Sequence, residues 1–336
     1  MVFQRRKEEY RKRGRANIMD RVHIIMAAYN GAAYLKEQIE SIRENSFTDW
    51  VLWIFDDGSV DGTENLAGEQ VVKDKERIRY IRNEKNKGVT RNFLDGVKTV
   101  LKEQADVIKE ETDNYFMFCD QDDFWMPDKI EKTLRVMKRY EKKYSKKLPL
   151  VVFTDAAITD EKLTVINPSF HKSNHLNTGK LDLPHMMMEN KLIGCTVMFN
   201  TALAMKLTII PENARYHDWW IGLLGAAFGH MVYIPAPTLY YRQHSGNVVG
   251  NQDFYGYAKK RMAAIGEQKK ALFSNAEQAK EFYDIFKDCL SKDKKMQVYA
   301  MANLMKQGWF SRRFQCIHYG FLKSGLLRNI ALLLII

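Results

Sequence analysis

The chain has 336 residues and a formal net charge of +11, with 52 Lys and Arg against 41 Asp and Glu. This length exceeds one typical domain of about 100–200 residues, which predicts either one large domain with an appendage or two domains. Its four cysteines, Cys119, Cys195, Cys289 and Cys316, include no C-x-x-C pair, which argues against a disulfide framework or zinc site and for a reducing compartment. The basic excess attracts phosphate groups, but no nucleic-acid-binding module is recognisable, so nucleic acid is not an expected partner.

The first 19 residues are predicted to form a basic arm. Seven basic and two acidic residues fall between Gln4 and Arg15, and no apolar run is present. A secretory signal requires such a run, so these residues do not resemble one. We expect three regions: the arm at residues 1–19, an α/β domain at 20–250 and a helical region at 251–336.

Short apolar runs typical of buried strands alternate with segments of helical spacing. In the first helical segment Leu35, Ile39 and Ile42 repeat on one face. This alternation predicts an α/β fold with a doubly wound, mostly parallel sheet and helices on both of its faces. The predicted strands are 22–28, 50–55, 78–81, 115–119, 150–155, 195–199, 231–234 and 238–241.

Polar segments are predicted to converge at one edge of this sheet, where ligands of open α/β sheets bind. Among them, Asp120, Asp122 and Asp123 suit a hard divalent cation that itself holds a diphosphate. Alternatively, the acidic turn only caps the helix that Pro127 opens, the role expected for Asp123. Neither G-x-G-x-x-G nor a P-loop occurs, so phosphate must be held in another way. The converging segments are Tyr29-Asn-Gly31, Asp56-Asp-Gly-Ser59, Asp120-Gln-Asp-Asp123 and Gly194-Cys-Thr196.

The last third of the chain carries helical sequence without strand signals. Ser274 and Glu277 form a capping box that predicts the start of a helix. The final apolar run, residues 326–336, is shorter than the about 20 residues that span a bilayer. Basic residues at Arg312, Arg313, Lys323 and Arg328 precede or interrupt it, which fits a helix lying in an anionic membrane surface. A helix docked on the main domain is the equally weighted alternative.

Five segments, in this order and at plausible spacing, resemble the family 2 glycosyltransferases of the GT-A fold, and most of all bacterial rhamnosyltransferase-type enzymes. The resemblance covers roughly residues 22–250 and includes neither the basic arm nor the helical region. The segments are Ala27-Ala-Tyr-Asn-Gly-Ala-Ala-Tyr-Leu-Lys-Glu-Gln-Ile39, Asp56-Asp-Gly-Ser-Val-Asp-Gly-Thr63, Asp120-Gln-Asp-Asp-Phe-Trp-Met-Pro-Asp-Lys-Ile130, His217-Asp-Trp-Trp220 and Tyr241-Arg-Gln-His244.

The resemblance implies a role for each matching residue. Asp218 would be the catalytic base, and Asp122 and His244 would hold Mg²⁺ or Mn²⁺ on the donor diphosphate. Asp57 would accept a hydrogen bond from N3 of a uracil or thymine base. Trp219, Cys195 and Thr196 would face the acceptor. The residues implied for the nucleotide sugar are Ala28, Tyr29, Asp57, Gly88, Asn92, Asp120 and Gln121.

Several of these residues also have a purely structural interpretation. Asp218 could be only the N-cap of its helix, and His244 a structural histidine. Asp56 is expected to bond its own turn, as Asx residues do. Trp219 and Trp220 are expected to divide between the core and a stacking surface for an acceptor sugar. The run Met186-Met-Met188 is expected to pack in the core or in a lid.

The function that follows from the resemblance is a metal-dependent, inverting sugar transfer in the cytoplasm, peripheral on the inner face of the membrane. The favoured donor is dTDP-rhamnose, with a bacterial surface polysaccharide or lipid-linked glycan as acceptor. A UDP-hexose donor and a non-catalytic, membrane-associated nucleotide-sugar-binding protein are the alternatives. A nucleotidyltransferase would need a Gly-rich basic loop after the first strand, and residues 27–33 contain none.

Overall fold

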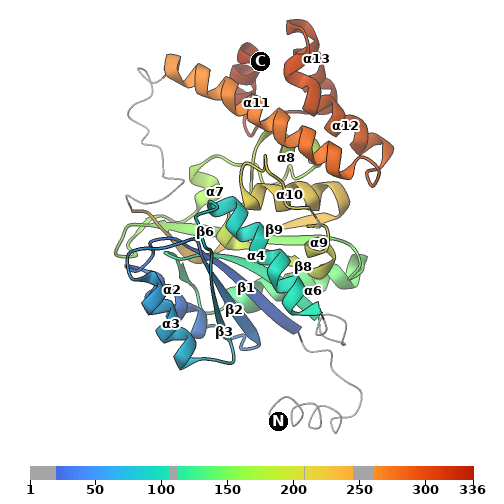
Figure 1. The fold of residues 1–336 in the computed structure, drawn as a ribbon. Coiled ribbons are helices and arrows are strands. Elements are labelled where there is room, and N and C mark those ends of the chain that lie inside the picture. Colours follow the sequence, from blue (N-terminus) through green and yellow to red (C-terminus); the bar gives the residue numbers. More distant parts are fainter. Residues whose placement is uncertain (1–19, 106–112, 208, 245–260) are drawn as a thin grey trace.

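The computed structural model shows a central sheet with helices on both faces, joined to a helical C-terminal region (Figure 1). The structure describes residues 20–105, 113–207, 209–244 and 261–336, so the predicted basic arm lies outside the described residues. The strands are β1 (Asp20–Ala28), β2 (Trp50–Asp56), β3 (Ile78–Arg82), β4 (Asp113–Asp120), β5 (Phe124–Trp125), β6 (Leu150–Thr159), β7 (Val165–Asn167), β8 (Val197–Asn200) and β9 (His230–Arg242).

The helices follow the same alternation through the first two thirds of the chain and then succeed one another directly. Those of the α/β part are α2 (Leu35–Arg43), α3 (Thr63–Lys73), α4 (Val89–Glu103), α6 (Lys129–Tyr144), α7 (Phe170–Ser173), α8 (Leu183–Met188), the 3₁₀ turn η1 (Gly194–Thr196), α9 (Thr201–Ala204) and α10 (His217–Phe228). Those of the C-terminal region are α11 (Arg261–Phe286), α12 (Lys292–Asn303), the 3₁₀ turn η3 (Leu304–Lys306), α13 (Trp309–Tyr319) and α14 (Leu326–Ile335).

The strand order is β3-β2-β1-β4-β8-β6-β9-β5, with β7 paired to β6. The pairs among β1 to β4, and the long pair of β6 with β9, are parallel, whereas β5, β7 and β8 pair in antiparallel fashion. In register, Ala28 pairs with Asp56, and Ala27 pairs with Asp120. The carboxyl ends of β1, β2 and β4 therefore meet at one edge, as predicted for a mostly parallel α/β sheet.

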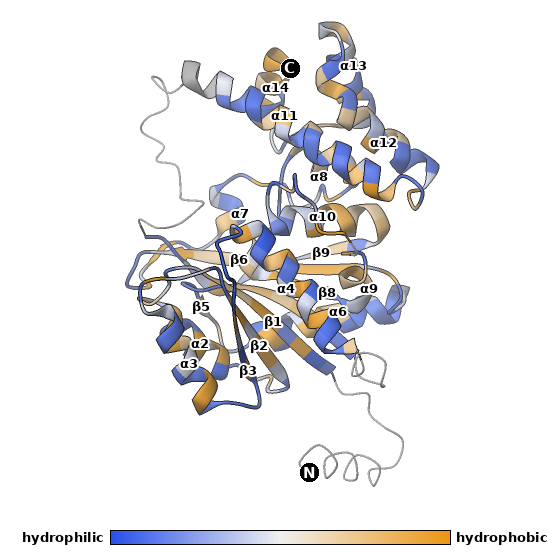
Figure 2. Ribbon diagram, viewed as in Figure 1, coloured by the Kyte–Doolittle hydropathy of each residue, from blue (hydrophilic) through white to orange (hydrophobic). Residues whose placement is uncertain are grey.

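Successive side chains of each strand point to opposite faces of the sheet, and helices cover both faces, so the sheet is buried on both sides. Along β4, Met117 and Cys119 join the core under α2, α3 and α6, whereas Phe116 and Phe118 join the core under α4 and α10. Figure 2 shows these strands as apolar, with polar residues on the outer faces of the helices. Met186, from the run expected in a core or lid, is fully buried in the core under α4 and α10.

The two late strands predicted at 231–234 and 238–241 are one strand, β9, in the structure. Pro235 and Pro237 lie between the two predicted segments, and proline cannot donate a ladder hydrogen bond. The register against β6 instead shifts there, so that Thr154 pairs with Ile234 and Asp155 with Pro237. This register shift accommodates the two prolines without a ladder hydrogen bond from them, and the strand continues beyond them.

The C-terminal helices dock on α10 and α8 (Figure 1). Phe282 of α11 packs edge-on against Trp220 of α10, with ring centroids 5.2 Å apart. The helix start predicted at the Ser274 capping box is wrong, because α11 is continuous from Arg261 and Ser274 lies inside it. None of the described helices is both long enough and apolar enough to cross a membrane.

Candidate active site

At the end of β1 the backbone is bound to the turns that follow β2 and β4. The carbonyl oxygen of Ala28 accepts a hydrogen bond from Asp57 N (2.8 Å). Tyr29 N donates to Gln121 Oε1 (2.9 Å), and Gln121 Nε2 donates back to Tyr29 O (3.0 Å). A Cβ on Gly31 would lie 2.0 Å from Gln121 Oε1, so glycine at this position makes room for the amide. Tyr29 itself is 48% exposed.

Asp57 organises the loop that leads into α4. Its carboxylate accepts hydrogen bonds from Lys87 N (2.9 Å), Gly88 N (2.8 Å) and Asn83 Nδ2 (2.8 Å). Gly88 has a φ of +82°, which disfavours any residue with a side chain. Asn92 accepts a bond from Asn83 Nδ2 (2.9 Å). The structure therefore brings Asp57, Gly88 and Asn92 together, and their role toward a nucleotide stays a prediction.

The Asp56 side chain bonds its own turn and strand β3. It accepts hydrogen bonds from Ser59 N (2.8 Å) and from the hydroxyl of Tyr80 (2.7 Å), and it is fully buried. These contacts are the structural role expected for it.

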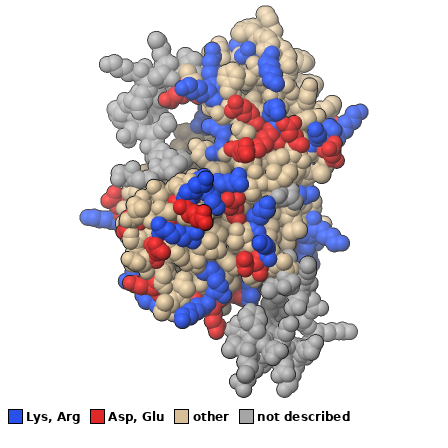
Figure 3. Space-filling view, in the orientation of Figure 1, with Lys and Arg blue, Asp and Glu red and all other residues tan. Residues whose placement is uncertain are grey.

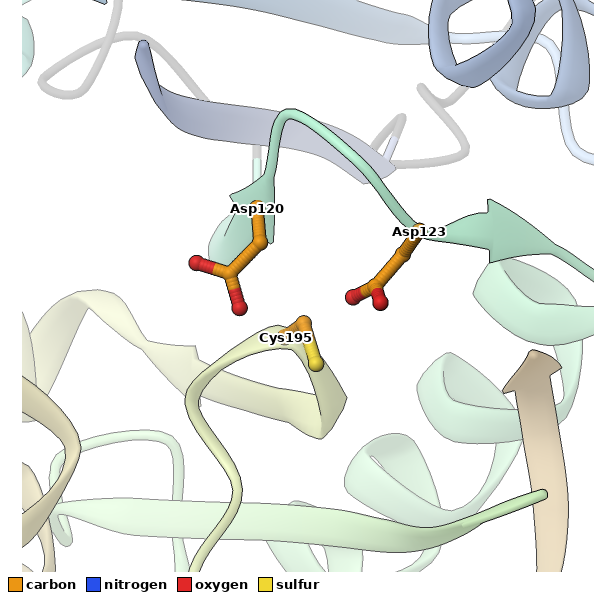
Figure 4. A group of neighbouring side chains, drawn as sticks. All are labelled: Asp120, Asp123 and Cys195. Carbon is orange, nitrogen blue, oxygen red and sulfur yellow. The ribbon is translucent and has the colours of Figure 1, made fainter. Parts of the chain in front are cut away.

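Asp120, Asp123 and Cys195 form a cluster whose ligand atoms all lie within 4.8 Å of one another. Figure 4 shows the two carboxylates flanking the thiol, with Asp120 at the end of β4, Asp123 beyond the following turn and Cys195 on η1. Asp123 is not a helix cap: it accepts a bond from Arg242 N (3.3 Å), and the N-cap of α6 is Asp128. The expectation that Asp123 is a cap is therefore wrong.

The structure also brings the implied metal pair, Asp122 and His244, into contact. His244 Nε2 lies 2.8 Å from Asp122 Oδ2, although the two residues come from the β4 turn and the end of β9. The His244 ring packs against Tyr34, with centroids 4.7 Å apart. Arg242 Nε donates to the carbonyl oxygen of Asp122 (2.8 Å) and so fixes the turn from the same strand end.

Burial and like charge shift the carboxyl groups of Asp120 and Asp123 toward their neutral forms. Burial raises the pKa of Asp120 to about 7, and the negative charges of Asp122 and Asp218 add to this effect. Burial and the neighbouring Asp120 and Asp122 raise the pKa of Asp123 well above its usual range. Asp123 Oδ2 is buried without a hydrogen-bond partner among the described residues. A divalent cation would reverse these shifts and supply the missing partner, so this oxygen-rich set fits a hard cation.

Asp218 lies in the first turn of α10 and is 7% exposed. It is not the N-cap, which is Tyr216, so the purely capping interpretation is wrong. Asp218 Oδ1 accepts a bond from Trp219 N (2.7 Å), and the Asn190 side chain and Gly194 N lie close enough to stabilise the charged form of the carboxyl group. Burial raises its pKa to about 6, against these interactions.

The three residues assigned to the acceptor do not present side chains to solvent. Trp219 is 4% exposed, and its indole nitrogen donates to the carbonyl oxygen of Met186. Cys195 and Thr196 are fully buried, and burial raises the pKa of the Cys195 thiol well above its usual range. These positions contradict an open acceptor surface there. Trp220 is buried as well, so the expected division between one core and one exposed tryptophan is wrong.

Three site residues were missed by the sequence analysis. Asn190 stabilises the charged form of Asp218 from a loop without any repeat or motif that could have indicated it. His217 is buried against Phe93 (ring centroids 3.9 Å apart), with neither ring nitrogen bonded among the described residues. Burial lowers the pKa of His217 to about 3, so its ring is neutral. Arg242 lies in a segment that the resemblance included, but no role was assigned to it.

Comparison with known proteins gives one family and several relatives. Residues 23–187 match the model of the family described as glycosyl transferase family 2. The chain is 27% identical over 249 residues to the dTDP-rhamnosyl transferase RfbG of Shigella flexneri, which covers 71% of this chain and 78% of the relative. It is 28% identical over 212 residues to the putative teichuronic acid biosynthesis glycosyltransferase TuaG of Bacillus subtilis, covering 62% of this chain and 73% of the relative.

Two of the solved structures with a similar chain trace were determined with a nucleotide sugar bound. One is S. aureus TarS 1-349 in complex with UDP-GlcNAc, at 13% identity and a TM-score of 0.48, covering 88% of this chain and 83% of that one. The other is the mannosyltransferase PcManGT from Pyrobaculum calidifontis in complex with GDP-Man and Mn²⁺, at 15% identity and a TM-score of 0.48, covering 99% and 85%.

Proposed function

We propose that this chain, a glycosyltransferase of family 2 with a GT-A type of fold, inverts the anomeric centre of the sugar that it transfers. We propose also that the transfer depends on a divalent cation. The enzyme moves a sugar from a nucleoside diphosphate to a hydroxyl group of a glycan acceptor. The observation that supports this most is the position of Asp218. Its buried carboxyl group lies close enough to Asp120 for their charges to interact, at the edge where β1, β2 and β4 end.

In this proposal Asp218 is the general base. It takes the proton of the acceptor hydroxyl as that oxygen attacks the anomeric carbon, and one displacement inverts the centre. A pKa of about 6 lets the group be a carboxylate at neutral pH while it still binds a proton appreciably. No nucleophile of the chain takes part, because the acceptor oxygen forms the new bond directly.

Asp120, Asp122, Asp123 and His244 would hold a Mg²⁺ or Mn²⁺ ion. When bound, the ion neutralises the charge that develops on the leaving diphosphate. Cys195 lies in the same cluster, but a buried, protonated thiol is a poor ligand for a hard cation. The thiol therefore fills space beside the carboxylates in this proposal and does not bind the ion.

The proposed donor is dTDP-rhamnose, and the proposed acceptor is a bacterial surface polysaccharide or lipid-linked glycan. The support for this donor is the 27% identity to a protein named a dTDP-rhamnosyl transferase. A UDP-hexose is the competing donor class. The residues of the site recognise the diphosphate and a pyrimidine base in either case, so the sugar has to be identified by experiment.

We further propose that the enzyme works while bound peripherally to the inner face of the membrane through α13 and α14. One side of α14 is docked, since Leu332 and Ile336 are buried. The outer sides of both helices expose a membrane face that consists of Trp309, Phe310, Phe314, Ile317, Leu326, Leu327, Ile330 and Leu334.

The charged residues of the segment that carries this membrane face are all basic. Residues 304–336 contain no Asp or Glu, and Arg313 stacks over Trp309 at 3.7 Å from the ring centroid. Figure 3 shows the end of the molecule where α13 lies as mainly uncharged surface with Lys and Arg. Apolar side chains beside basic ones favour the boundary of an anionic bilayer. The basic residues of this segment are Lys306, Arg312, Arg313, Lys323 and Arg328.

The test of the sugar transfer is release of nucleoside diphosphate from dTDP-rhamnose, UDP-glucose, UDP-galactose and UDP-N-acetylglucosamine, with Mn²⁺ or Mg²⁺ and after chelation. We expect turnover of one donor that stops on chelation and falls at least about a hundredfold in Asp218→Asn. Asp284→Asn, an exposed carboxylate on α11, is the matched control with wild-type turnover. Equal turnover in Asp218→Asn and wild type would overturn the assignment of the base.

A further inference from the structure

The last turn of α8 has backbone carbonyl groups without partners inside that helix, as helix ends do. Two of them accept hydrogen bonds from side chains that are far away in sequence. Trp219 Nε1 of α10 donates to Met186 O (2.5 Å), and Asn275 Nδ2 of α11 donates to Met188 O (3.1 Å). Both donor side chains are buried. The end of α8 is therefore bound at once to α10, which carries the proposed base, and to the C-terminal region.

Asn275 also binds the loop that leads into α10. Its Oδ1 accepts a hydrogen bond from Arg215 Nη1 (2.5 Å). The guanidinium carbon of Arg215 in turn lies 4.9 Å from the centroid of the Trp219 ring, a position in which the ring attracts the cation. Both ends of the Asn275 amide are thus occupied, one by each of the two segments that contact the Trp219 side chain.

Other side chains of α11 hold the backbone of the same loop. Gln278 Oε1 accepts a bond from Arg215 N (2.9 Å). The carboxylate of Glu281 accepts bonds from Glu212 N (2.8 Å) and Asn213 N (2.6 Å). Since α10 begins at the second residue after Arg215, these bonds fix the place where α10 starts.

The residue that follows α8 is attached to the C-terminal region as well. Glu189 Oε2 accepts a bond from Ser324 N (2.9 Å), and Glu189 Oε1 accepts one from Arg328 Nη1 (2.9 Å). Lys191 is fully buried, and its ammonium group donates to the same Glu189 Oε2 (2.9 Å). Buried charges are costly unless both partners stay in place, so the end of α8 has one position while the C-terminal region is docked.

Trp219 connects these contacts to the proposed base. Its backbone nitrogen donates to Asp218 Oδ1 (2.7 Å), and this bond favours the carboxylate over the neutral acid. The side chain of the same residue is fixed by Met186 O on one side and by Arg215 on the other. A movement of the indole ring away from these partners therefore also moves the nitrogen that holds the carboxyl group.

We propose that Trp219 is a positioning residue for Asp218, and that Asn275 of α11 holds Trp219 in place on two sides, through Arg215 and through the end of α8. This inference rests on the proposed function of Asp218 as base. It makes the helical region a part of the catalytic apparatus in addition to any role at a membrane. Small displacements of a reacting group are costly in rate.

The first test is Trp219→Phe, which removes the indole N–H but keeps an aromatic ring. We expect kcat to fall at least about tenfold, whereas the KM of the donor and the affinity for nucleoside diphosphate stay within about twofold. The acid limb of kcat, near pH 6 in wild type, should move upward by at least about half a unit, because the bond from the backbone nitrogen is weakened.

The neighbouring Trp220→Phe is the matched control. It removes the same part of a buried ring, but the Trp220 indole nitrogen has no hydrogen-bond partner among the described residues. We expect wild-type kcat and an unchanged acid limb in this variant. Equal losses in the two variants, or a loss through donor affinity alone in Trp219→Phe, would overturn the proposal.

The second test is Asn275→Leu, which keeps the approximate shape but loses the bonds to Arg215 and Met188. We expect a similar fall in kcat and an upward shift of the acid limb, with kcat counted per molecule that binds nucleoside diphosphate. The matched control is Asn303→Leu on α12, because the Asn303 amide donates to Tyr299 O of its own helix. Wild-type kcat in Asn275→Leu would overturn the role of α11.

The two proposals fail in different ways. If Asp218→Asn is as active as wild type, the assignment of the base is wrong and Trp219 has nothing to position. If Asp218→Asn is inactive but Trp219→Phe keeps wild-type kcat and the wild-type acid limb, the base is correct and the positioning role is wrong.

Discussion

At Asp218, burial and hydrogen bonding act on the pKa in opposite directions. Burial favours the neutral acid, whereas Asn190, Trp219 N and Gly194 N favour the carboxylate, and the result is a pKa of about 6. Only the carboxylate can accept the proton of an acceptor hydroxyl. We therefore predict that kcat rises with pH through about 6 and reaches a plateau above it, measured between pH 5 and 8.

Cation binding could produce a similar acid limb, because Asp120, with a pKa of about 7, also loses its proton when it binds an ion. The profile is therefore measured at several saturating Mn²⁺ concentrations. An acid limb that stays near pH 6 at each concentration belongs to Asp218. A limb that moves steadily downward with Mn²⁺ would assign the dependence to the cation site and contradict the prediction.

Gly31 illustrates how one missing Cβ shapes the donor side of the site. The side chain of Gln121 occupies the space that an alanine Cβ would need, and it bonds the backbone of Tyr29 there. We predict that Gly31→Ala displaces the amide and weakens nucleotide binding about tenfold, because the exposed Tyr29 turn loses its two bonds. Titration with dTDP or UDP measures the change, and the melting temperature should change little.

A double-mutant cycle separates this mechanism from a general disturbance of the turn. Gln121→Ala removes the same amide directly, so its effect and that of Gly31→Ala should not add in the double variant. If the two losses add in full, the alanine at position 31 acts in another way, and the proposed role of Gln121 is contradicted.

At the scale of single residues, the sequence predicted the site residues that belong to motifs. It missed the residues that reach the site only because of how the chain folds. Asp122 and His244 meet as implied, because each ends a strand of the same sheet edge. Burial was harder to infer. Cys195 and Trp219 lie in the matching segments, yet their side chains point into the core, and only the packing of η1 and α10 decides this. Asn190 depends on a loop that has no pattern of its own.

At the scale of elements, strands were easier to predict than the limits of helices. The apolar runs of β1, β2 and β4 gave their positions to within two residues, because a strand buried on both faces is mostly apolar in its middle, and its polar residues lie mainly near its ends. The capping box at Ser274 failed because local capping is a weak preference. Tertiary contacts of α11 with α12 and α10 outweigh it.

The membrane face of α13 and α14 carries an element-scale prediction. Phe310 and Phe314 are 81% and 67% exposed, so replacing both with serine costs the fold little. Transfer of each ring into a bilayer boundary is favourable by about 1.5–3 kcal/mol at most. We predict that the double variant binds anionic vesicles at least tenfold more weakly than wild type, measured by co-sedimentation.

Two comparisons make this test specific. Val72→Ser on α3, also an exposed apolar residue, should leave vesicle binding unchanged. Wild-type binding should weaken on neutral vesicles and in high salt, because the basic residues around the membrane face act through screened charge. Equal binding of wild type and the double variant would show that α13 does not enter the bilayer.

At the scale of the whole molecule, the predicted division near residue 250 does not separate two cores. One hydrophobic cluster extends from Phe118 of β4 through Trp220 of α10 to Phe282 of α11 and Leu332 of α14. Composition distinguished the helical region because its strand signals end, but composition contains no information on docking. The shared core explains how Ser324 and Arg328 reach Glu189 at a fixed geometry.

A shared core predicts that the two regions unfold together. Phe282 is 1% exposed at the junction, so Phe282→Ala should destabilise the protein by about 3–5 kcal/mol. Phe273→Ala on the same helix is the matched control with little effect, since Phe273 is 51% exposed. Hydrogen exchange in denaturant, followed separately for β4 and α12, measures the result. Equal opening free energies for both elements, lowered equally by Phe282→Ala, are expected, whereas loss of protection in α12 alone would show that the helical region is an independent unit.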